Sequence, residues 1–359
     1  MKDTVMIAES TEIKPLIELS ERVGRDPLLT QASTGNSSVK AGDVLWIKAS
    51  GKCMADAARE DFLLPLPLEE VRRSIRDNID PRDRYPKASI ETAMHAVLPH
   101  PVVLHVHCAD TVAWVVREDA WEQLERRLNG LPARWFGYVQ SGLPLARKIE
   151  SCLTDARASE VLLLGNHGLV IAGQDCETVE RLLGEVRRRL ASTPRAAHPP
   201  DYAALTEVAE QFGWTLPEDD SMHSMATDVV SAGIIARGFL YPCQSILSHA
   251  AAPEIFRAVD YAELMEPWAT ALRLRPFLLI AGRGMILNPI MTASERALLA
   301  GLSQVVQRID RNAPLRYLTD QELSAISSLY AASYLGGSAR TAVRKDQAAN
   351  SASAASSAA

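Results

Sequence analysis

Pro101-Val-Val-Leu-His-Val-His-Cys108 is the stretch of sequence that decides the fold. Its Val and Leu residues predict a buried β-strand, and alternate side chains of a strand point to the same face. His105 and His107 therefore share one face of this strand. Two imidazoles in apolar surroundings are costly to bury unless something binds them. A divalent metal is the simplest partner, because imidazole is its commonest ligand in proteins.

An open catalytic metal site needs a third protein ligand and keeps positions for substrate or water. Of the eight His in the chain, His167 is the best candidate. It lies in Gly165-Asn-His-Gly168, between two apolar runs that predict a β-hairpin. Glu91, at the start of a predicted helix, is the candidate for proton transfer beside the metal. His95 lies one helical turn later and is expected to pack or to support the ligands.

Other interpretations of the HxH pair remain at this point. Both His could be polar residues of a half-exposed strand. A cupin site would need a carboxylate soon after the second His, where the sequence offers only Asp110. An amidohydrolase barrel would need repeated strand–helix units, which the sequence does not show. Two loops of small residues, Gly35-Asn-Ser-Ser38 and Ala49-Ser-Gly51, could present backbone N–H groups to an anion or be ordinary turns.

Composition narrows the class of protein. The chain has 359 residues, of which 47% are hydrophobic and 23% charged, with a net charge of -6. These values are typical of a soluble globular protein and predict no general attraction to nucleic acid or membranes. Neither a signal peptide nor a membrane span is expected. The five Cys form no CxxC motif, so we expect reduced thiols and a cytoplasmic location.

Periodicity and turn residues predict two domains and a tail. The first domain is expected over residues 1–195, the second over 200–335, and a disordered Ala/Ser-rich tail over 336–359. Expected helices of the first domain are 11–24, most of 61–77, 90–98 with Ser89 as N-cap, 120–128 and 176–190; expected strands are 44–48, 101–108, 161–164 and 169–172. The second domain is expected to contain a strand at 277–280 and helices at 292–309 and 319–334. Residues 31–40 and 81–86 are expected to be loops.

The order of the motifs resembles that of the class II aldolase/adducin family. The matching segments are Thr34-Gly-Asn-Ser-Ser-Val-Lys40, Lys48-Ala-Ser-Gly51, Ser89-Ile-Glu91 with His95, His105-Val-His107 and Asn166-His-Gly168. The resemblance covers about residues 10–195. Residues 200–335 resemble the extension of a larger rhamnose-utilisation subgroup, although the dehydrogenase domain of that subgroup is not expected here. The fold implied is an α/β, three-layer class II aldolase-like fold, with a central, mainly antiparallel sheet flanked by helices, plus a smaller α/β C-terminal domain.

The resemblance also implies site residues. His105, His107 and His167 would bind the divalent metal, most often zinc, with manganese, cobalt or iron as alternatives. Glu91 would move the proton at carbon, and Tyr138 would serve the aldehyde oxygen in a neighbouring subunit's site. The residues implied to hold the substrate, which is a phosphate in many members, are Asn36, Ser50, Gly51, Ser89 and Lys40. The implied assembly is a homotetramer with active sites between subunits.

The implied activity is that of a metal-dependent aldehyde-lyase of carbohydrate metabolism, which cleaves a hydroxy-ketone or ketose through a metal-stabilised enediolate. The same ligands serve epimerases, decarboxylases and iron-dependent oxygenases. A non-catalytic adducin-like binding module is the alternative from another class, although that lineage has lost ligands that this chain retains. Ile90 stands where the phosphate-binding enzymes have a second serine, so the substrate need not be phosphorylated. Tyr241-Pro-Cys-Gln244 lacks the Asp-His that often follows Tyr-Pro in the subgroup.

Overall fold

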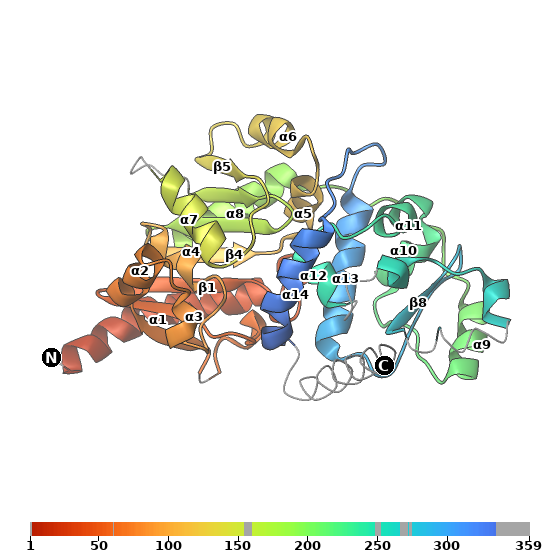
Figure 1. The fold of residues 1–359 in the computed structure, drawn as a ribbon, viewed down its shortest axis with the longest axis horizontal. Helices are drawn as coiled ribbons and strands as arrows, with labels where there is room; N and C mark the ends of the chain where they lie inside the picture. Colours follow the sequence, from red (N-terminus) through yellow and green to blue (C-terminus); the bar gives the residue numbers. More distant parts are fainter. Residues whose placement is uncertain are drawn as a thin grey trace, which may run out of the picture.

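The computed structural model describes residues 2–59, 61–153, 160–247, 253–265, 272 and 275–334. Two parts lie side by side in Figure 1, and we refer to them as the N-terminal part, residues 2–190, and the C-terminal part, residues 202–334. The predicted tail over residues 336–359 lies outside the described residues.

The N-terminal part is built on a seven-stranded sheet with the strand order β3-β2-β1-β4-β7-β6-β5. The strands are β1 Asn36–Ala41, β2 Val44–Lys48, β3 Leu63–Pro67, β4 Val102–Val106, β5 Ala133–Phe136, β6 Val161–Leu164 and β7 Gly168–Gly173. β5 and β6 run parallel, whereas the other neighbouring pairs are antiparallel. The mainly antiparallel central sheet predicted from the sequence is therefore confirmed.

Helices cover both faces of this sheet and make three layers. On one face lie α1 (Lys2–Gly24), α5 (Ala109–Val115), α6 (Ala120–Arg127) and α8 (Cys176–Leu190); on the other lie α2 (Leu68–Arg76), α4 (Thr92–Val97) and α7 (Leu143–Cys152). The central strand β4 is apolar along its length because it is buried on both faces. Its residues Val102, Leu104 and Val106 enter the first core and Val103 enters the second. His105 consequently lies on the same face as α4.

Two expectations for the first eighty residues are wrong. Residues 31–40 are not one loop, because β1 begins at Asn36. The sequence of β1 lacks apolar alternation, since its inward side chains form hydrogen bonds instead of a core. Residues 61–77 were expected to be mostly helical, but the strand β3 occupies Leu63–Pro67 and the helix α2 covers only Leu68–Arg76. Pro65 and Pro67 are accommodated since β3 is an edge strand, where a missing N–H leaves no gap in the sheet.

Two further expectations fail at helix ends. Residues Pro81–Arg84 form a short helix, α3, rather than a loop, and the Asp80 side chain accepts a hydrogen bond from the backbone N–H of Arg82. Ser89 is not the N-cap of the next helix, because α4 begins after Glu91. The Ser89 hydroxyl instead accepts a hydrogen bond from the Glu91 N–H at 3.3 Å.

The C-terminal part is smaller and mostly helical. It contains α9 (Tyr202–Phe212), α10 (Ser224–Thr227), α11 (Val229–Ile235), α12 (Pro242–Ile246), a hairpin of β8 (Phe277–Ile280) and β9 (Gly284–Leu287), α13 (Ala293–Arg308) and α14 (Asp320–Tyr334). The predicted strand at 277–280 and both long helices are confirmed within one residue at each end. In Figure 1, α13 and α14 lie between the sheet of the N-terminal part and the hairpin. Side chains of α5 share a hydrophobic core with α13, so the two parts are packed together.

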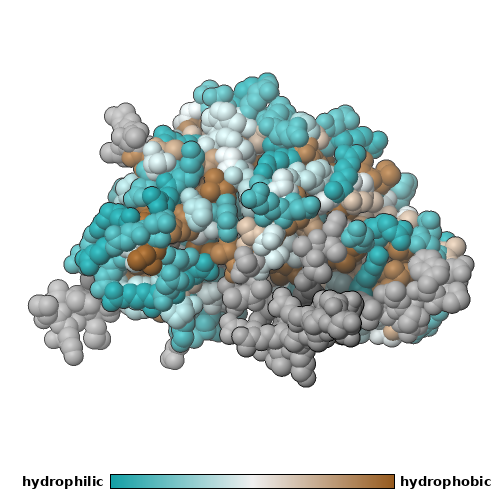
Figure 2. Space-filling model, in the orientation of Figure 1, coloured by the Kyte–Doolittle hydropathy of each residue, from teal (hydrophilic) through white to brown (hydrophobic). Residues whose placement is uncertain are grey.

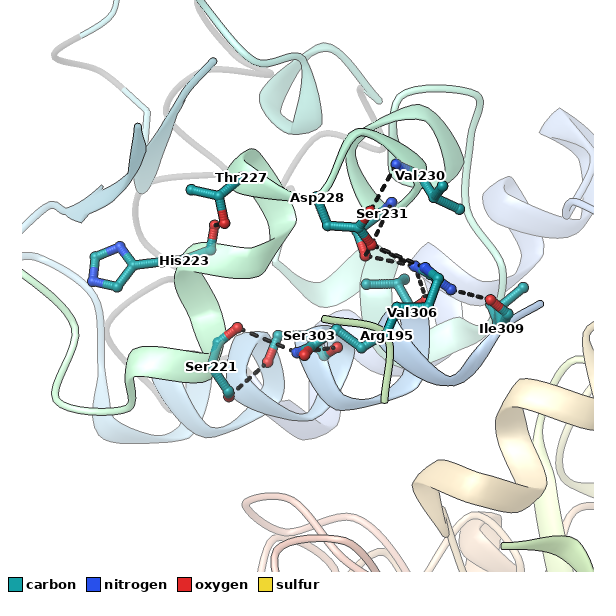
Figure 3. Close-up of polar contacts among 11 residues, drawn as sticks. Arg195, Ser221, His223, Thr227, Asp228, Val230, Ser231, Ser303, Val306 and Ile309 are labelled. Atoms are coloured by element: carbon teal, nitrogen blue, oxygen red, sulfur yellow. Dashed lines mark hydrogen bonds and ion pairs between the residues drawn. The ribbon is translucent and has the colours of Figure 1, made fainter. Parts of the chain in front are cut away.

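The segment that joins the two parts is held by hydrogen bonds. Arg195 forms an ion pair with Asp228 at 2.7 Å and donates to the hydroxyl of Ser231. Its guanidinium also donates to the backbone carbonyls of Val306 and Ile309, near the end of α13 (Figure 3). The Pro-containing boundary around residues 192–200 is thus anchored to the C-terminal part.

Few large hydrophobic side chains are exposed among the described residues. Among the described residues, the large exposed hydrophobic side chains are Ile79, Tyr202, Val229 and Ile290, each in a different segment. Hydrophilic side chains predominate over the N-terminal part on the face drawn in Figure 2. No helix in the described part of the chain has both the length and the apolar composition needed to cross a bilayer.

Candidate metal centre

Three imidazoles meet at the end of β4. His105 is in β4, His107 follows the end of that strand, and His167 lies in the turn between β6 and β7. All three are buried, with at most 6% exposure. Their ring centroids are 4.8–5.2 Å apart, and one ligand atom from each lies within 4.8 Å of the others. The sequence placed these residues in one site, and the structure brings them together in an arrangement that could hold a metal ion.

The turn that carries His167 depends on Gly168. A Cβ atom at this position would lie 2.6 Å from the carbonyl oxygen of Val106 and 3.2 Å from ring atoms of His105 and His107. Any larger residue would force β7 away from β4. Asn166, on the other side of His167, has a φ of 49°, in the left-handed region that Asn tolerates better than most residues. The turn is therefore closely fitted to the histidine pair.

The hydrogen bonds of His105 select its ligand nitrogen. Its Nδ1 lies 3.0 Å from the carbonyl oxygen of Leu169, which can only accept, so Nδ1 carries the hydrogen and Nε2 keeps its lone pair. This Nε2 faces the Nε2 of His107 at 3.0 Å. Burial lowers the pKa of His105 and of His167 to about 4, so both rings are neutral at pH 7. Neutral buried imidazoles with converging nitrogens are the donor set that a divalent cation requires.

Glu91 lies against two of the imidazoles. Its Oε2 is 3.3 Å from His105 Nε2, and its Oε1 is 3.3 Å from His167 Nε2. Oε1 is buried and has no hydrogen-bond partner among the described residues. A buried carboxylate oxygen without a donor, next to neutral imidazoles, fits a site that holds a cation.

A chain of hydrogen bonds orients Glu91. The Asn36 amide donates to Glu91 Oε2 at 2.7 Å, and the Asn36 carbonyl oxygen accepts from His95 Nε2 at 2.5 Å. His95 Nδ1 in turn lies 2.7 Å from the Ser38 hydroxyl. Because Asn36 pairs with His105 across β1 and β4, its side chain is on the same face as the histidines. Asn36 therefore holds the Glu91 carboxylate directly, and His95 holds Asn36 in place through its own hydrogen bond.

A cavity opens next to this centre, with an empty volume of about 470 Å³ that includes its open mouth. It is lined by Ser33, Gly35, Asn36, Lys48, Ser50, Gly51, Ser89, Ile90, Glu91, His107 and His167. Four of the predicted substrate-binding residues, Asn36, Ser50, Gly51 and Ser89, are thus brought to the cavity, and Lys40 is not.

Lys48, rather than Lys40, supplies the positive charge at the cavity. Lys40 is four residues beyond Asn36 along β1, where its ammonium donates to the carbonyl of His100 at 2.7 Å. Lys48 is 3% exposed and donates to the carbonyls of Ser33 and Lys52 at 2.9 and 2.6 Å. Burial lowers its pKa to about 8, and no described carboxylate lies within 4.0 Å of its Nζ. In the sequence, Lys48 was considered only as part of the segment Lys48-Ala-Ser-Gly51, and no role was predicted for it.

Tyr138 is half-buried away from the cavity. Its ring lies 5.1 Å from the guanidinium of Arg316, which belongs to the C-terminal part. Burial raises the pKa of its phenol to about 12. Within one chain Tyr138 does not line the cavity, and its predicted role in a neighbouring subunit's site stays a prediction.

Comparison with known proteins gives matches for the N-terminal part. Residues 15–190 match the family model described as "Class II Aldolase and Adducin N-terminal domain". The "Uncharacterized oxidoreductase YuxG" of Bacillus subtilis (strain 168) is 27% identical in an alignment of 188 residues that covers 46% of this chain and 27% of that protein. The chain therefore spans about a quarter of the length of this curated relative.

Two solved structures are also similar to this chain. The N-terminal class II aldolase domain of a conserved protein from Thermoplasma acidophilum has a TM-score of 0.44 and 21% identity, over 50% of this chain and 92% of that one. An l-fuculose-1-phosphate aldolase from Thermus thermophilus has a TM-score of 0.37 and 20% identity, over 49% of this chain and 89% of that one.

Proposed function

Because residues 15–190 belong to the class II aldolase and adducin N-terminal domain family, we propose that this protein is a metal-dependent aldolase that cleaves a hydroxy-ketone or ketose. The observation that carries the proposal is the cluster of His105, His107 and His167 with the carboxylate of Glu91 against it. Zinc is the expected cation, and manganese, cobalt and iron are alternatives that three imidazoles also accept. An adducin-like binding module without catalysis would have no need of this set.

Each residue of the site has a distinct task in the proposed reaction. The three histidines would hold the cation, which when bound supplies Lewis-acid stabilisation of negative charge that develops on substrate oxygens. Glu91 takes or gives the proton at the carbon beside the carbonyl. Asn36, with His95 behind it, keeps the Glu91 carboxylate in one orientation through the 2.7 Å hydrogen bond. The histidines remain neutral at pH 7 and leave the proton chemistry to the carboxylate.

The substrate class follows from Lys48. A buried ammonium with no carboxylate partner within the described residues is costly until an anion binds beside it. The neighbouring Ser50, Gly51 and Ser89 line the same cavity and can donate hydrogen bonds to that anion. We therefore propose a small substrate that carries a carboxylate or phosphate in addition to its hydroxy-ketone group.

The proposal is tested by product analysis of the metal-loaded protein. A panel of small hydroxy-ketones, acidic and phosphorylated, is incubated with the zinc, manganese and cobalt forms, and aldehyde release is followed. Appearance of an aldehyde supports the aldolase. Formation of an epimer, release of CO₂ or uptake of oxygen would assign the site to another reaction on the same ligands. A protein that binds metal and converts no substrate in the panel would count against an aldolase.

Replacement of Lys48 by Met is expected to weaken use of an anionic substrate. Hydrogen bonds to charged groups contribute about 1.5–3 kcal/mol, so kcat/KM should fall about 10- to 100-fold. For a neutral hydroxy-ketone that lacks the anionic group, kcat/KM should change by less than about threefold.

Lys40→Met is the matched control, since Lys40 lies on the neighbouring strand with its pKa lowered by burial to about 7 and lines no part of the cavity. It should leave both kcat/KM values unchanged. Equal losses for the charged and the neutral substrate in Lys48→Met would show that Lys48 does not bind the anion.

We include the predicted homotetramer in this proposal. Tyr138 does not line the cavity of its own chain, and in a tetramer it would serve the aldehyde oxygen in a neighbouring subunit's site. Light scattering after size-exclusion chromatography measures the assembly directly. A monomer with full activity would remove Tyr138 from the proposed site.

A further inference from the structure

We propose that the C-terminal part of the chain positions two of the three imidazoles of the metal centre. It reaches His107 through the thiol of Cys243 and the turn of His167 through Leu240 and Arg316. This inference rests on the metal site of the proposed function but not on the aldolase reaction. It gives residues 202–334 a task at the site, where the sequence predicted only a domain of unknown role.

Cys243 contacts His107 on the ring atom that faces away from His105. The Cys243 Sγ is 3.1 Å from His107 Nδ1, while His107 Nε2 is directed at His105. Cys243 is 5% exposed and stands at the start of α12, so its backbone is fixed by the core of the C-terminal part. A hydrogen bond from Nδ1–H to this sulfur leaves the lone pair of Nε2 free for a cation. Partners of this kind orient a ligand ring and select its tautomer.

The second contact is at Asn166, which precedes His167. The Asn166 amide donates to the carbonyl oxygens of Leu240 and Arg316, each at 2.8 Å. The side-chain oxygen Oδ1 of Asn166 accepts a hydrogen bond from the Arg316 guanidinium at 3.1 Å. The C-terminal part thus satisfies the polar atoms of a side chain that is only 1% exposed. Because Asn166 holds a left-handed backbone conformation, these bonds fix the turn from which His167 projects.

Arg316 is itself held at both ends. Its backbone N–H donates to the carbonyl of Val116, and its guanidinium pairs with Glu322 at 2.5 Å. The backbone N–H of Asn166 donates to Val115, the neighbour of Val116. The turn, the end of α5 and the C-terminal part therefore form one connected unit. A shift of the C-terminal part would move His107 and His167 relative to His105, whose Nδ1 is bound within the sheet.

The test measures cation affinity in the full-length protein, by competition of Zn²⁺ with a chelator and by the visible absorption of bound Co²⁺. Cys243→Ala should weaken Zn²⁺ binding about 10- to 100-fold, as is usual when the partner of a ligand is removed. Cys243→Ser should restore the affinity to within about threefold of the parent, because a hydroxyl can accept the same hydrogen bond. Asn166→Gly keeps the left-handed backbone and removes the side chain, and should weaken binding about tenfold.

Matched controls are available in the same chain. Asn78 also has a positive φ, of 61°, and Cys176 is a half-buried cysteine of α8, so Asn78→Gly and Cys176→Ala should leave Zn²⁺ affinity unchanged. The cobalt spectrum should shift for Cys243→Ala and Asn166→Gly and not for the controls. Zn²⁺ affinity is measured below the melting temperature of each variant. If Cys243→Ala and Asn166→Gly both bind Zn²⁺ within threefold of the parent, the C-terminal part packs against the site without positioning its imidazoles. A parent that binds no cation would overturn the metal site and this inference together.

Discussion

Glu91→Gln is expected to lower kcat for carbon–carbon bond cleavage about 10³-fold, in the middle of the range for a proton-transfer group. Gln has nearly the same volume as Glu, and its carbonyl oxygen can still accept the hydrogen bond that Asn36 donates to Glu91 Oε2 at 2.7 Å. What it cannot do is take up a proton from carbon. The loss should therefore appear in kcat, with little change in KM.

Metal content separates this explanation from a collapsed site. Because the imidazoles are unchanged, Glu91→Gln should bind one zinc per chain, measured by elemental analysis after dialysis. Glu122→Gln is the control and should retain full activity, because Glu122 is an exposed residue of α6 in the N-terminal part. A kcat within tenfold of the parent would assign proton transfer to another group.

His105→Gln is expected to weaken zinc binding about 10²- to 10³-fold and to abolish activity at micromolar zinc. A structural zinc site with four ligands contributes about 10–16 kcal/mol, or roughly 2.5–4 kcal/mol per ligand. His105 is the most constrained of the three, because its Nδ1 bonds to Leu169 within the sheet and its ring is fully buried. Gln occupies similar space and can keep the contact to Leu169, so the fold should persist.

His100→Gln is the matched control for that variant. His100 is another buried histidine, 6% exposed, but it precedes β4 at the end remote from His107. It should bind zinc like the parent. Binding by isothermal titration calorimetry gives both values, and parent-like affinity in His105→Gln would remove His105 from the ligand set.

Much of this site could be predicted from local sequence. The HxH strand and the β6–β7 hairpin follow from short apolar runs with turn residues between them, and these two elements carry all three histidines. Amphipathic periodicity predicted both ends of α8 correctly, because the buried side chains of this helix recur at helical spacing.

What the sequence did not reveal has physical causes. β1 was expected to be a loop, because Asn36 and Ser38 are polar; their hydrogen bonds to Glu91 and His95 replace the apolar core that a strand normally shows. Lys40, and not Lys48, was among the residues expected to hold the substrate, and no local pattern shows which of two strand lysines directs its ammonium to a cavity. The contact of Cys243 with His107 joins residues 136 positions apart, and such a pairing exists only in the folded chain.

The hydrogen-bond partners of Asn166 are synthesised much later than Asn166 itself. Leu240 and Arg316 follow Asn166 by 74 and 150 residues. A ribosome releases the sheet with its histidines long before it releases these carbonyl groups. During that interval the Asn166 side chain lacks its partners in the C-terminal part and is left to bind water, although β4 and β7 can already pair. The proposed cation site would therefore be completed late in synthesis, when Leu240 and Arg316 reach Asn166, and we expect a nascent N-terminal part to hold metal weakly until then.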